Sequence, residues 1–287
     1  MTIIAGTDGT DWGMTAVEWA AAEAQRRRTP LRIAHAFDWD WRDSRFGVGA
    51  KYVEVARELA EAVAAEALDR AREVAPDIDV TTDTLPGHAA PRLLEAALGA
   101  ELLVLGSRGR GGFAGLLLGS VSQRLATHAP CPVVVIRSRS VPGGPVAVGV
   151  DDHPAADHVL AAAFEAAARE ECGLIVVRSF APAIPPWLPD VRRAGIPTPE
   201  EKAIELGRIE EQLRPWREKY PDVAVESVLT HDTAAACLVR GSNSTRLVVV
   251  GSHGHGEIAG SLLGSVGLQL LHHAACPVLI VREEPAP

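Results

Sequence analysis

Residues 103–137 read LVLGSRGRGGFAGLLLGSVSQRLATHAPCPVVVIR, and residues 248–282 read VVVGSHGHGEIAGSLLGSVGLQLLHHAACPVLIVR. In both stretches an aliphatic run enters a glycine-rich loop, a helix-like segment follows, and a second aliphatic run comes after Cys-Pro. The spacing between the copies is constant, at 145 residues from Gly106 to Gly251. Because self-similarity at a fixed spacing is the mark of a repeated structural unit, the chain is predicted to contain two copies of one domain.

The repeat extends over nearly the whole chain. IIAGTD ends at Asp8 and VAVGVD ends at Asp151, an offset of 143 residues, and a drift of two residues within a domain is an ordinary loop insertion. A turn-rich joint with the sequence Val-Pro-Gly-Gly-Pro lies within residues 138–145. A chain of 287 residues is long enough for two compact domains. We therefore predict domains at residues 1–140 and 145–287.

Aliphatic runs alternate with helical segments in each copy, which is the pattern of βα units on a parallel sheet. The 47% of hydrophobic residues include few aromatic ones, so the core is expected to consist of Ala, Val, Leu and Ile. Right-handed crossovers then give an open twisted sheet with helices on both faces. The expected strands are 2–6, 31–37, 80–85, 102–106 and 133–137, then 146–150, 174–180, 225–229, 247–251 and 278–281; the expected helices of the first copy are 12–27, 52–74, 89–98 and 120–128.

The glycine-rich loop carries the chemistry. Gly106-Ser107-Arg108-Gly109 follows a strand, nine residues intervene, and Gly119-Ser120 opens the next predicted helix. Glycines let backbone N–H groups approach an anion closely, and a helix N-terminus offers further N–H groups and the positive end of its dipole. In open α/β sheets, ligands bind beyond the carboxyl ends of the strands where the strand order reverses. The loop is therefore predicted to hold phosphate groups.

This arrangement resembles the ATP-binding loop of the universal stress protein family, and the endings HAPCPVVVIR and HAACPVLIVR resemble the last strand of that family. The resemblance covers each half once and is to tandem members of the actinobacterial type. It implies two Rossmann-like five-stranded parallel sheets with the strand order 3-2-1-4-5. It also implies ATP, with or without Mg, as ligand, and a regulatory or sensing role in the response to stress or dormancy.

The resemblance also assigns roles to individual residues. Asp8 would lie beside the nucleoside, Ala36 would line the adenine pocket, and Gly87 would lie at its rim. The phosphates and the ribose would be held by Gly106, Gly109, Gly119, Ser120, Val121 and Ser122. The matching residues of the second copy are Asp151, Ser179, Gly251, Gly254, Gly264, Ser265 and Val266.

The second copy departs from the pattern at several positions. Gly267 stands in place of a serine, so a hydroxyl that would face the phosphates is lost. Arg178 replaces His35, and His231 is taken to stand where the first copy has Gly87. We expect the N-terminal site to bind ATP more readily than the C-terminal one.

The same residues have structural interpretations. The glycines of the loop could be needed only for the conformation of the turn, and Asp8 could cap the first helix. Arg108 and Arg110 could reach phosphates through charge-assisted hydrogen bonds or could be solvated loop residues. No metal site is expected, because the histidine pairs of the second copy come without a matching set of carboxylates or cysteines.

No enzymatic motif accompanies the loop. It lacks the Gly-Lys-Ser/Thr ending with which P-loop proteins contact phosphates and magnesium, and the chain has no Gly-x-Ser-x-Gly elbow. We therefore predict an ATP-binding regulator that is not an enzyme in the usual sense and has no catalytic residues. The alternatives are a slow ATP hydrolase and a dimerisation scaffold that binds no nucleotide.

Charge and hydropathy bear on partners and location. A net charge of −9 argues against nucleic acid and against an anionic membrane surface as partners. The absence of a leader or of an apolar run long enough to span a membrane predicts a cytoplasmic protein. The aliphatic edge strands at 133–137 and 278–282 predict pairing of the two halves and a homodimer, because pairing covers exposed edges. A regulatory protein partner of unknown identity is also expected.

Overall fold

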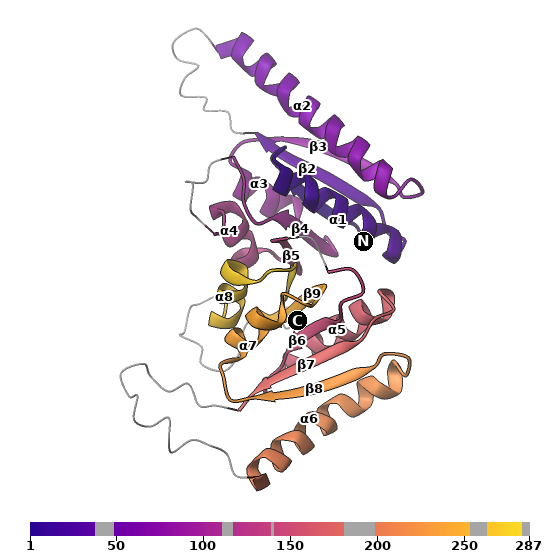
Figure 1. The fold of residues 1–287 in the computed structure, drawn as a ribbon. Helices are drawn as coiled ribbons and strands as arrows, with labels where there is room; N and C mark the ends of the chain where they lie inside the picture. The colour runs from indigo at the N-terminus through magenta and orange to yellow at the C-terminus, as the bar shows by residue number, and fades with distance from the viewer. Residues whose placement is uncertain (38–48, 111–116, 139–140, 181–198, 253–262, 283–287) are drawn as a thin grey trace, which may run out of the picture. The chain divides into compact units, whose positions relative to one another are not determined.

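The computed structural model describes the chain apart from residues 38–48, 111–116, 139–140, 181–198, 253–262 and 283–287. The chain divides into two compact units, Met1–Arg137 and Ser138–Pro287. Each unit is a parallel sheet flanked by helices (Figure 1). No helix within the described residues is both long enough and apolar enough to cross a membrane.

The first unit follows the predicted alternation of strands and helices. Its element ends differ from the predicted ones by no more than three residues. Its strands are β1 (Ile3–Thr7), β2 (Leu31–Phe37), β3 (Val80–Pro86), β4 (Leu102–Gly106) and β5 (Val133–Ile136), and its helices are α1 (Asp11–Arg27), α2 (Gly49–Val74), α3 (Ala89–Ala96) and α4 (Ser120–His128).

The second unit repeats this order of elements. Its strands are β6 (Val146–Gly149), β7 (Leu174–Ser179), β8 (Val225–Thr230), β9 (Leu247–Gly251) and β10 (Val278–Val281), and its helices are α5 (Ala156–Arg169), α6 (Pro199–Lys219), α7 (Ala234–Gly241) and α8 (Ser265–His273).

The strand order of the first unit is β3-β2-β1-β4-β5, and the second unit has the equivalent order β8-β7-β6-β9-β10. All of these pairings are parallel; Ile3, for example, lies opposite Leu31 on one side and Leu102 on the other. The predicted fold class and the order 3-2-1-4-5 are confirmed in both halves. The order reverses between β1 and β4, so the carboxyl ends of these two strands form the place where such sheets bind ligands.

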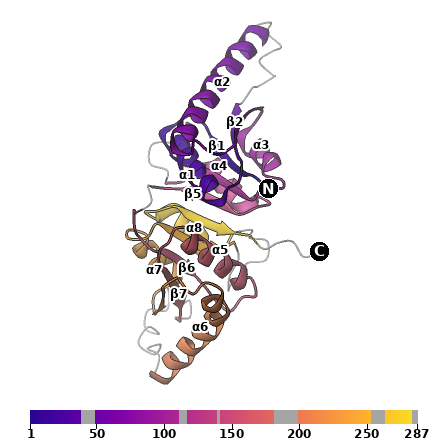
Figure 2. The same ribbon diagram turned by 90° about the vertical axis from the view of Figure 1, so that its right-hand side faces the viewer.

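Burial explains why the central strands are aliphatic. All five residues of β1 and of β4 are buried, whereas the edge strands β3 and β8 are half-buried. In the first unit α1 packs against α2 on one face, and α3 packs against α4 on the other. Figure 2 shows α2 running past the end of its sheet, in agreement with the exposure of Val55 and Leu59 in its first turns. The core therefore lies between the sheet and the helices of each unit.

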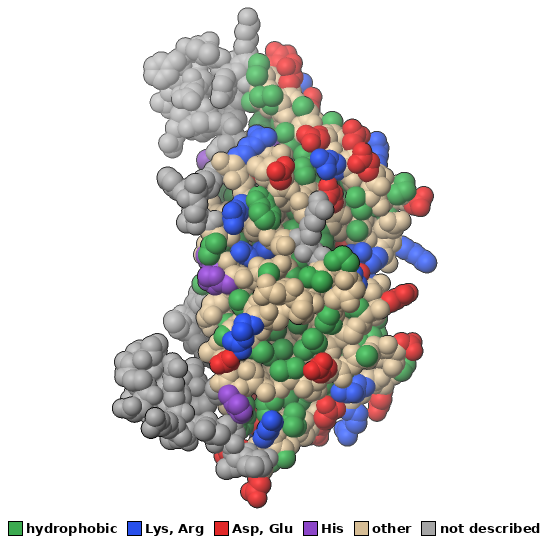
Figure 3. All heavy atoms as spheres, in the orientation of Figure 1, with side chains coloured by type: hydrophobic (Ala, Val, Ile, Leu, Met, Phe, Trp, Pro, Cys, Tyr) green, Lys and Arg blue, Asp and Glu red, His purple; other side chains and the backbone are tan. Residues whose placement is uncertain are grey.

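The charged surface is mixed in sign. Lys and Arg alternate with Asp and Glu over the described face of both units (Figure 3). Many of these side chains pair along a helix, as Arg57 does with Glu61 at 3.2 Å. Exposed pairs of this kind contribute little to stability, so the fold rests on its aliphatic core.

An ion pair with reversed charges joins the same two positions in both units. Arg27, at the end of α1, contacts Glu101 before β4 with a 2.8 Å separation between Nη1 and Oε1. In the second unit Glu170, at the end of α5, contacts Arg246 before β9 at 2.9 Å. All four side chains are mostly shielded from solvent. The ion pair is thus present in both units, with the positions of the acidic and the basic residue exchanged.

The helix ends before these strands also repeat. Arg28 has φ 53°, Glu171 has φ 47°, and both adopt the left-handed conformation that ends a helix. The N–H of the next residue bonds back five residues in each case, from Thr29 to the Ala24 carbonyl and from Cys172 to the Ala167 carbonyl, at 3.0 Å. This is the Schellman arrangement, which usually has glycine at the left-handed position.

We predict that Arg28→Gly and Glu171→Gly each raise the free energy of unfolding by roughly 0.5–1 kcal/mol, because glycine adopts this conformation without strain. The gain should be larger at Glu171, whose negative charge lies at the negative end of a helix dipole. Urea denaturation of the variants measures the change.

The reverse substitution supplies the control. Gly99 has φ +73° and no atom within 4 Å of an added Cβ, so Gly99→Ala should lose stability through backbone strain alone. Destabilisation by both glycine variants would contradict the assignment of strain to Arg28 and Glu171.

Candidate functional site

The site of the first unit begins where β4 ends at Gly106. An added Cβ at Gly106 would lie 2.6 Å from the backbone oxygen of Trp12, in the first turn of α1. Glycine is required here by close approach of two backbones, since Gly106 has no positive φ that would demand it. The first turn of α1 therefore packs directly against the end of β4, at the reversal point of the strand order.

A backbone hydrogen bond closes the glycine loop in each unit. The Gly119 N–H donates to the Ser107 carbonyl at 2.8 Å, and the Gly264 N–H donates to the Ser252 carbonyl at 2.7 Å. Ser107 and Ser252 are buried. This bond returns the chain to the carboxyl end of β4 or β9, so the N-terminus of the following helix lies beside the strand end.

The helices that follow have no side-chain cap. Gly119 is the N-cap of α4 and Gly264 is the N-cap of α8, and neither has a side chain that could accept from the first turn. Ser120 is exposed and Val121 half-buried, as are their counterparts Ser265 and Val266. The first-turn N–H groups of an uncapped helix need partners, and an anion supplies them.

Asp8 fastens the glycine loop to the loop after β1. Its Oδ1 accepts from the Thr10 N–H at 3.1 Å and from the Thr10 hydroxyl at 2.6 Å, and its Oδ2 accepts from the Arg110 N–H at 2.7 Å. The N-cap of α1 is Thr10, which accepts from the Gly13 N–H. The interpretation of Asp8 as the helix cap is therefore wrong, and Asp8 orients the residue that is the cap.

The carboxylate of Asp8 also explains a second glycine. An added Cβ at Gly109 would overlap Oδ2 of Asp8. Gly119 differs, because an added Cβ there would meet its nearest atom, the Ser107 oxygen, at an ordinary 3.4 Å. Gly109 is thus needed by the protein itself, whereas a side-chain methyl group at Gly119 would make only ordinary van der Waals contacts.

His35 lies buried beside these groups at the end of β2. Its Nδ1 lies 2.8 Å from the Thr7 carbonyl oxygen, and Thr7 is its partner in the β1–β2 register. Burial lowers the pKa of His35, and the positive charge of Arg110 lowers it further, against the opposing effects of the Thr7 carbonyl and Asp8. The imidazole is therefore favoured in its neutral form.

Arginines gather around the loop. The Arg108 guanidinium lies over the ring of Trp12, 5.4 Å from its centroid, and Arg137 donates from Nη1 to the Leu117 carbonyl at 3.0 Å. Burial lowers the pKa of Arg137, and the nearby charge of Arg108 lowers it further. Within the described residues, no carboxylate forms a salt bridge with Arg108 or Arg110. The loop is thus a region of concentrated positive charge.

The remaining predicted residues of the first unit lie near this region. Ala36 is half-buried and follows His35 on β2. Gly87 has φ +119° at the end of β3, which explains the glycine, and its N–H donates to the Phe37 carbonyl at 2.9 Å. Ser122 is buried and its hydroxyl donates to the Gly106 carbonyl at 2.6 Å. Ser122 therefore links α4 to β4, and its hydroxyl proton is donated within the protein.

The second unit builds a similar site from Asp151, Ser179 and its own glycine loop. The Asp151 Oδ1 accepts from the His153 N–H at 3.0 Å. Ser179 follows Arg178 on β7 and donates to the Asp232 carbonyl at 2.8 Å. Gly251 ends β9 beside Val281 of β10. Gly254 lies outside the described residues.

The strand registers correct one expectation about the second unit. Val80 lies opposite Leu31, and Val225 lies opposite Leu174. The offset on these edge strands is therefore already 145 residues, and Asp232, not His231, occupies the position of Gly87. The prediction that His231 replaces this glycine is wrong by one residue, because the two-residue insertion precedes β8.

Two other departures have visible consequences. An added Cβ at Gly267 would lie 2.9 Å from Leu263 Cδ1, so an apolar side chain fills the space beside the position of Ser122. Arg178, which replaces His35, is buried and forms ion pairs with Asp152 and with Glu205 of α6, the latter at 3.1 Å. The second unit thus neutralises its buried cation internally.

Comparison with known proteins agrees with this geometry. The model of the universal stress protein family matches residues 1–137 and again residues 144–282. Universal stress protein Rv2005c of Mycobacterium tuberculosis is 36% identical over 299 residues, covering 98% of this chain and 97% of the relative. The chain belongs to the universal stress protein family.

Other comparisons support the tandem form. Universal stress protein Rv2623 of M. tuberculosis is 35% identical over 292 residues, covering 98% of this chain and 96% of the relative. A universal stress protein from Archaeoglobus fulgidus has the same fold, with a TM-score of 0.73, 17% identity and 98% coverage of both chains. This protein is thus a tandem universal stress protein similar to mycobacterial relatives, with the stress-response role that the family name denotes.

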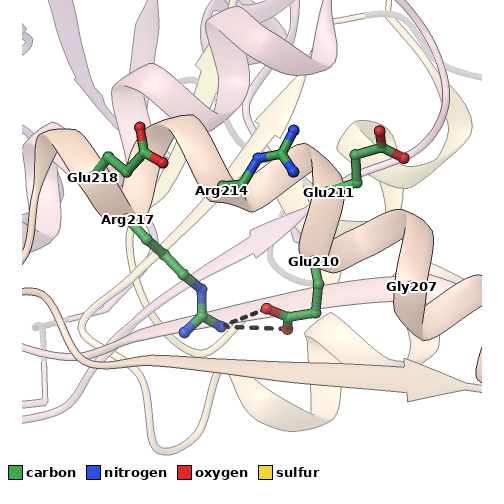
Figure 4. A pocket seen from close by; sticks show the side chains of 6 residues that line it. All are labelled: Gly207, Glu210, Glu211, Arg214, Arg217 and Glu218. Atoms are coloured by element: carbon green, nitrogen blue, oxygen red, sulfur yellow. Dashed lines mark hydrogen bonds and ion pairs between the residues drawn. The ribbon is translucent and has the colours of Figure 1, made fainter.

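A surface hollow elsewhere on this universal stress protein has a different character. It lies along α6 and is lined by Gly207, Glu210, Glu211, Arg214, Arg217 and Glu218 (Figure 4). Arg217 pairs with Glu210 at 3.3 Å. All six residues come from one helix, and none belongs to a loop at the carboxyl end of a strand. The hollow is a solvated helix face and not part of either candidate site.

Sequence reasoning missed Trp12, Thr10 and Arg137. Trp12 and Thr10 reach the site because α1 starts against β4, and Arg137 reaches it from the end of β5. Comparison of the two copies offered one signal for Trp12, since the equivalent residue of the second copy is Ala155. A large aromatic side chain that is present in just one of the two copies indicates a role specific to that copy.

We predict that Gly109→Ala lowers the free energy of unfolding by about 1–3 kcal/mol, because the added methyl group breaks the hydrogen bonds of Asp8. Gly119→Ala is the matched control and should change stability by less than about 0.5 kcal/mol, since its φ of −78° and its surroundings accept a side chain. Equal losses in urea denaturation would contradict this assignment.

The pKa of His35 predicts a pH dependence. Because the folded pKa lies below the unfolded value, the unfolded state binds more protons, and stability falls as pH drops below about 6.5. Wild type should lose more stability between pH 7 and pH 5 than His35→Gln does. His128→Gln, which removes an exposed histidine of α4, is the control and should behave like wild type. A slope in His35→Gln as steep as that of wild type would refute the prediction.

Proposed function

We propose that the first unit of this universal stress protein binds ATP, and that its occupancy regulates the protein's role in the stress response. The observation that carries the proposal is the pair of Arg108 and Arg137 beside the uncapped N-terminus of α4. Backbone N–H groups at a helix start and nearby guanidinium groups are the donors that bind phosphate in proteins.

Electrostatics favour an anionic ligand at this loop. Arg108 and Arg137 are close enough for one charge to lower the pKa of the other. Such repulsion costs free energy in the empty protein, and a bound polyphosphate would remove it. The protein's overall charge is −9, so this local excess of positive charge stands out against its surroundings.

The nucleoside would lie toward β1 and β2. Ala36 and Gly87 flank the carboxyl end of β2, beside the buried His35. This edge lies next to the strand-order reversal, where α/β sheets of this type hold nucleotides. A magnesium ion accompanying ATP would take its ligands from phosphate and water, because both oxygens of Asp8 already accept hydrogen bonds.

The second unit is proposed to bind ATP more weakly. His253 and His255 stand in its sequence where the first loop has Arg108 and Arg110. Its buried cation, Arg178, is neutralised by carboxylates of its own unit. The second loop therefore offers an anion less uncompensated positive charge.

Slow or absent turnover is part of the proposal. Fast hydrolysis needs a group that orients the attacking water, and Asp8, the acidic residue next to the loop, is fixed by Thr10 and the Arg110 N–H. Binding without turnover fits a regulator whose conformation or partner interface responds to occupancy. A homodimer and a regulatory protein partner stay predictions.

The proposal predicts that isothermal titration of nucleotide-free protein with ATP shows a first site that Gly119→Ala weakens at least tenfold. The added methyl group would crowd phosphates at the start of α4 while leaving the empty loop intact. Gly264→Ala, the matching change in the second unit, should leave this first site unchanged. Absence of any heat of binding with ATP in the wild type would reject the proposal.

Turnover is measured on the same preparation by phosphate release. We expect fewer than about one turnover per minute, far below the usual range for enzymes. Faster release that is lost in Gly119→Ala would mean that the protein is an ATP hydrolase.

A further inference from the structure

One pair of contacting side chains distinguishes the first glycine loop from the second. Arg108 lies over the ring of Trp12 in the first unit. The equivalent residues of the second copy are Ala155 and His253, so the aromatic ring and the guanidinium group are both missing there. The two partners come from different parts of the chain and are present or absent together, which indicates that they act as a pair.

The contact limits where Arg108 can go. Arginine has many rotamers, and holding its guanidinium group against an indole ring reduces the entropy lost when it binds a ligand. The backbone of Trp12 is held in place, because its oxygen lies against Gly106 at the end of β4. The guanidinium group is therefore held against the indole ring, at the first turn of α1 beside the end of β4, before any ligand arrives.

Arg137 faces the same loop from its other end. It follows β5 and donates to the Leu117 carbonyl, two residues before the N-cap of α4. The charge of Arg108 lowers the pKa of Arg137, so the two guanidinium groups are near enough to repel each other. One ligand at the start of α4 would thus meet a guanidinium group from each side of the loop.

We propose that Arg108, positioned by Trp12, and Arg137 form a two-guanidinium clamp that selects nucleotides by the length of their phosphate chain. The proposal rests on ATP binding at the first unit and adds a specificity to it. The N-terminus of α4 holds one phosphate, and the clamp holds the phosphates beyond it. The ligand class is a nucleoside triphosphate, favoured over the diphosphate and strongly favoured over the monophosphate.

The charges support this selectivity. A monophosphate can be satisfied by the helix N-terminus alone, and its binding would leave the two arginines repelling each other. A triphosphate carries further charge and can accept charge-assisted hydrogen bonds from both guanidinium groups. Each additional phosphate should therefore strengthen binding.

The test is the ratio of the Kd for AMP to the Kd for ATP, measured by isothermal titration on the full chain. Arg108→Gln and Arg137→Gln should each weaken ATP binding about tenfold and AMP binding less than about twofold, since a charged hydrogen bond is lost only with the longer chain. The ratio should therefore fall about tenfold in each variant.

Trp12 is tested as a positioning residue. Trp12→Ala should lower the same ratio, and Trp12→Phe, which keeps an aromatic face, should restore much of it. Arg72→Gln is the matched control: Arg72 is exposed in the last turn of α2, at the end of that helix away from the glycine loop, and the ratio should stay at its wild-type value.

The outcomes separate this proposal from the one on which it rests. If wild type binds ATP but the ratio is unchanged in both Arg108→Gln and Arg137→Gln, the clamp is wrong and ATP binding stands. If wild type binds no nucleotide, both proposals fail. An equal weakening of ATP and AMP in these variants would also overturn the clamp, because it would mean that the arginines contact the first phosphate only.

Discussion

The hydrogen bond from the Gly119 N–H to the Ser107 carbonyl organises the candidate site, and the Gly264–Ser252 bond repeats it. Each bond turns a long glycine loop back to the strand from which it left. The helix N-terminus then lies at the reversal of the strand order, beside the first turn of the helix that follows β1. Asp8 fixes the other side of the loop through the Arg110 N–H. The donors are therefore arranged by backbone bonds before any ligand binds, which lowers the entropy lost on binding.

The two units use one backbone design with different electrostatics. The first keeps Arg108 and Arg110 at the loop without a salt bridge to a carboxylate among the described residues, and its buried His35 is favoured as neutral. The second places Arg178 at the equivalent position and pairs it with Asp152 and Glu205. Away from the site the two units differ without a change in net charge: the ion pair Arg27–Glu101 of the first unit has its acid and base exchanged in Glu170–Arg246 of the second. The contrast is between a first unit whose loop arginines suit an anion and a second unit whose buried Arg178 is paired with carboxylates.

The repeat, the strand order and the glycine loop could be predicted from the sequence, because aliphatic runs and glycine spacing are local signals. The roles of Thr10 and Trp12 could not, since they depend on how closely α1 approaches β4. Ser122 matched the expected spacing, yet its hydroxyl bonds to Gly106. The alignment of His231 with Gly87 is wrong because an insertion between β7 and β8 shifts the numbering by two residues. Only the strand pairing shows where that insertion lies.

The start of α4 is proposed to hold the phosphates of ATP. Hydrogen exchange measured by mass spectrometry, with and without saturating ATP, tests it most directly. We expect peptides covering residues 117–128 to exchange more slowly with ATP, and peptides covering 263–273 to change less. Unchanged exchange at 117–128 under conditions where ATP is bound would contradict the claim and would place the nucleotide elsewhere on the protein.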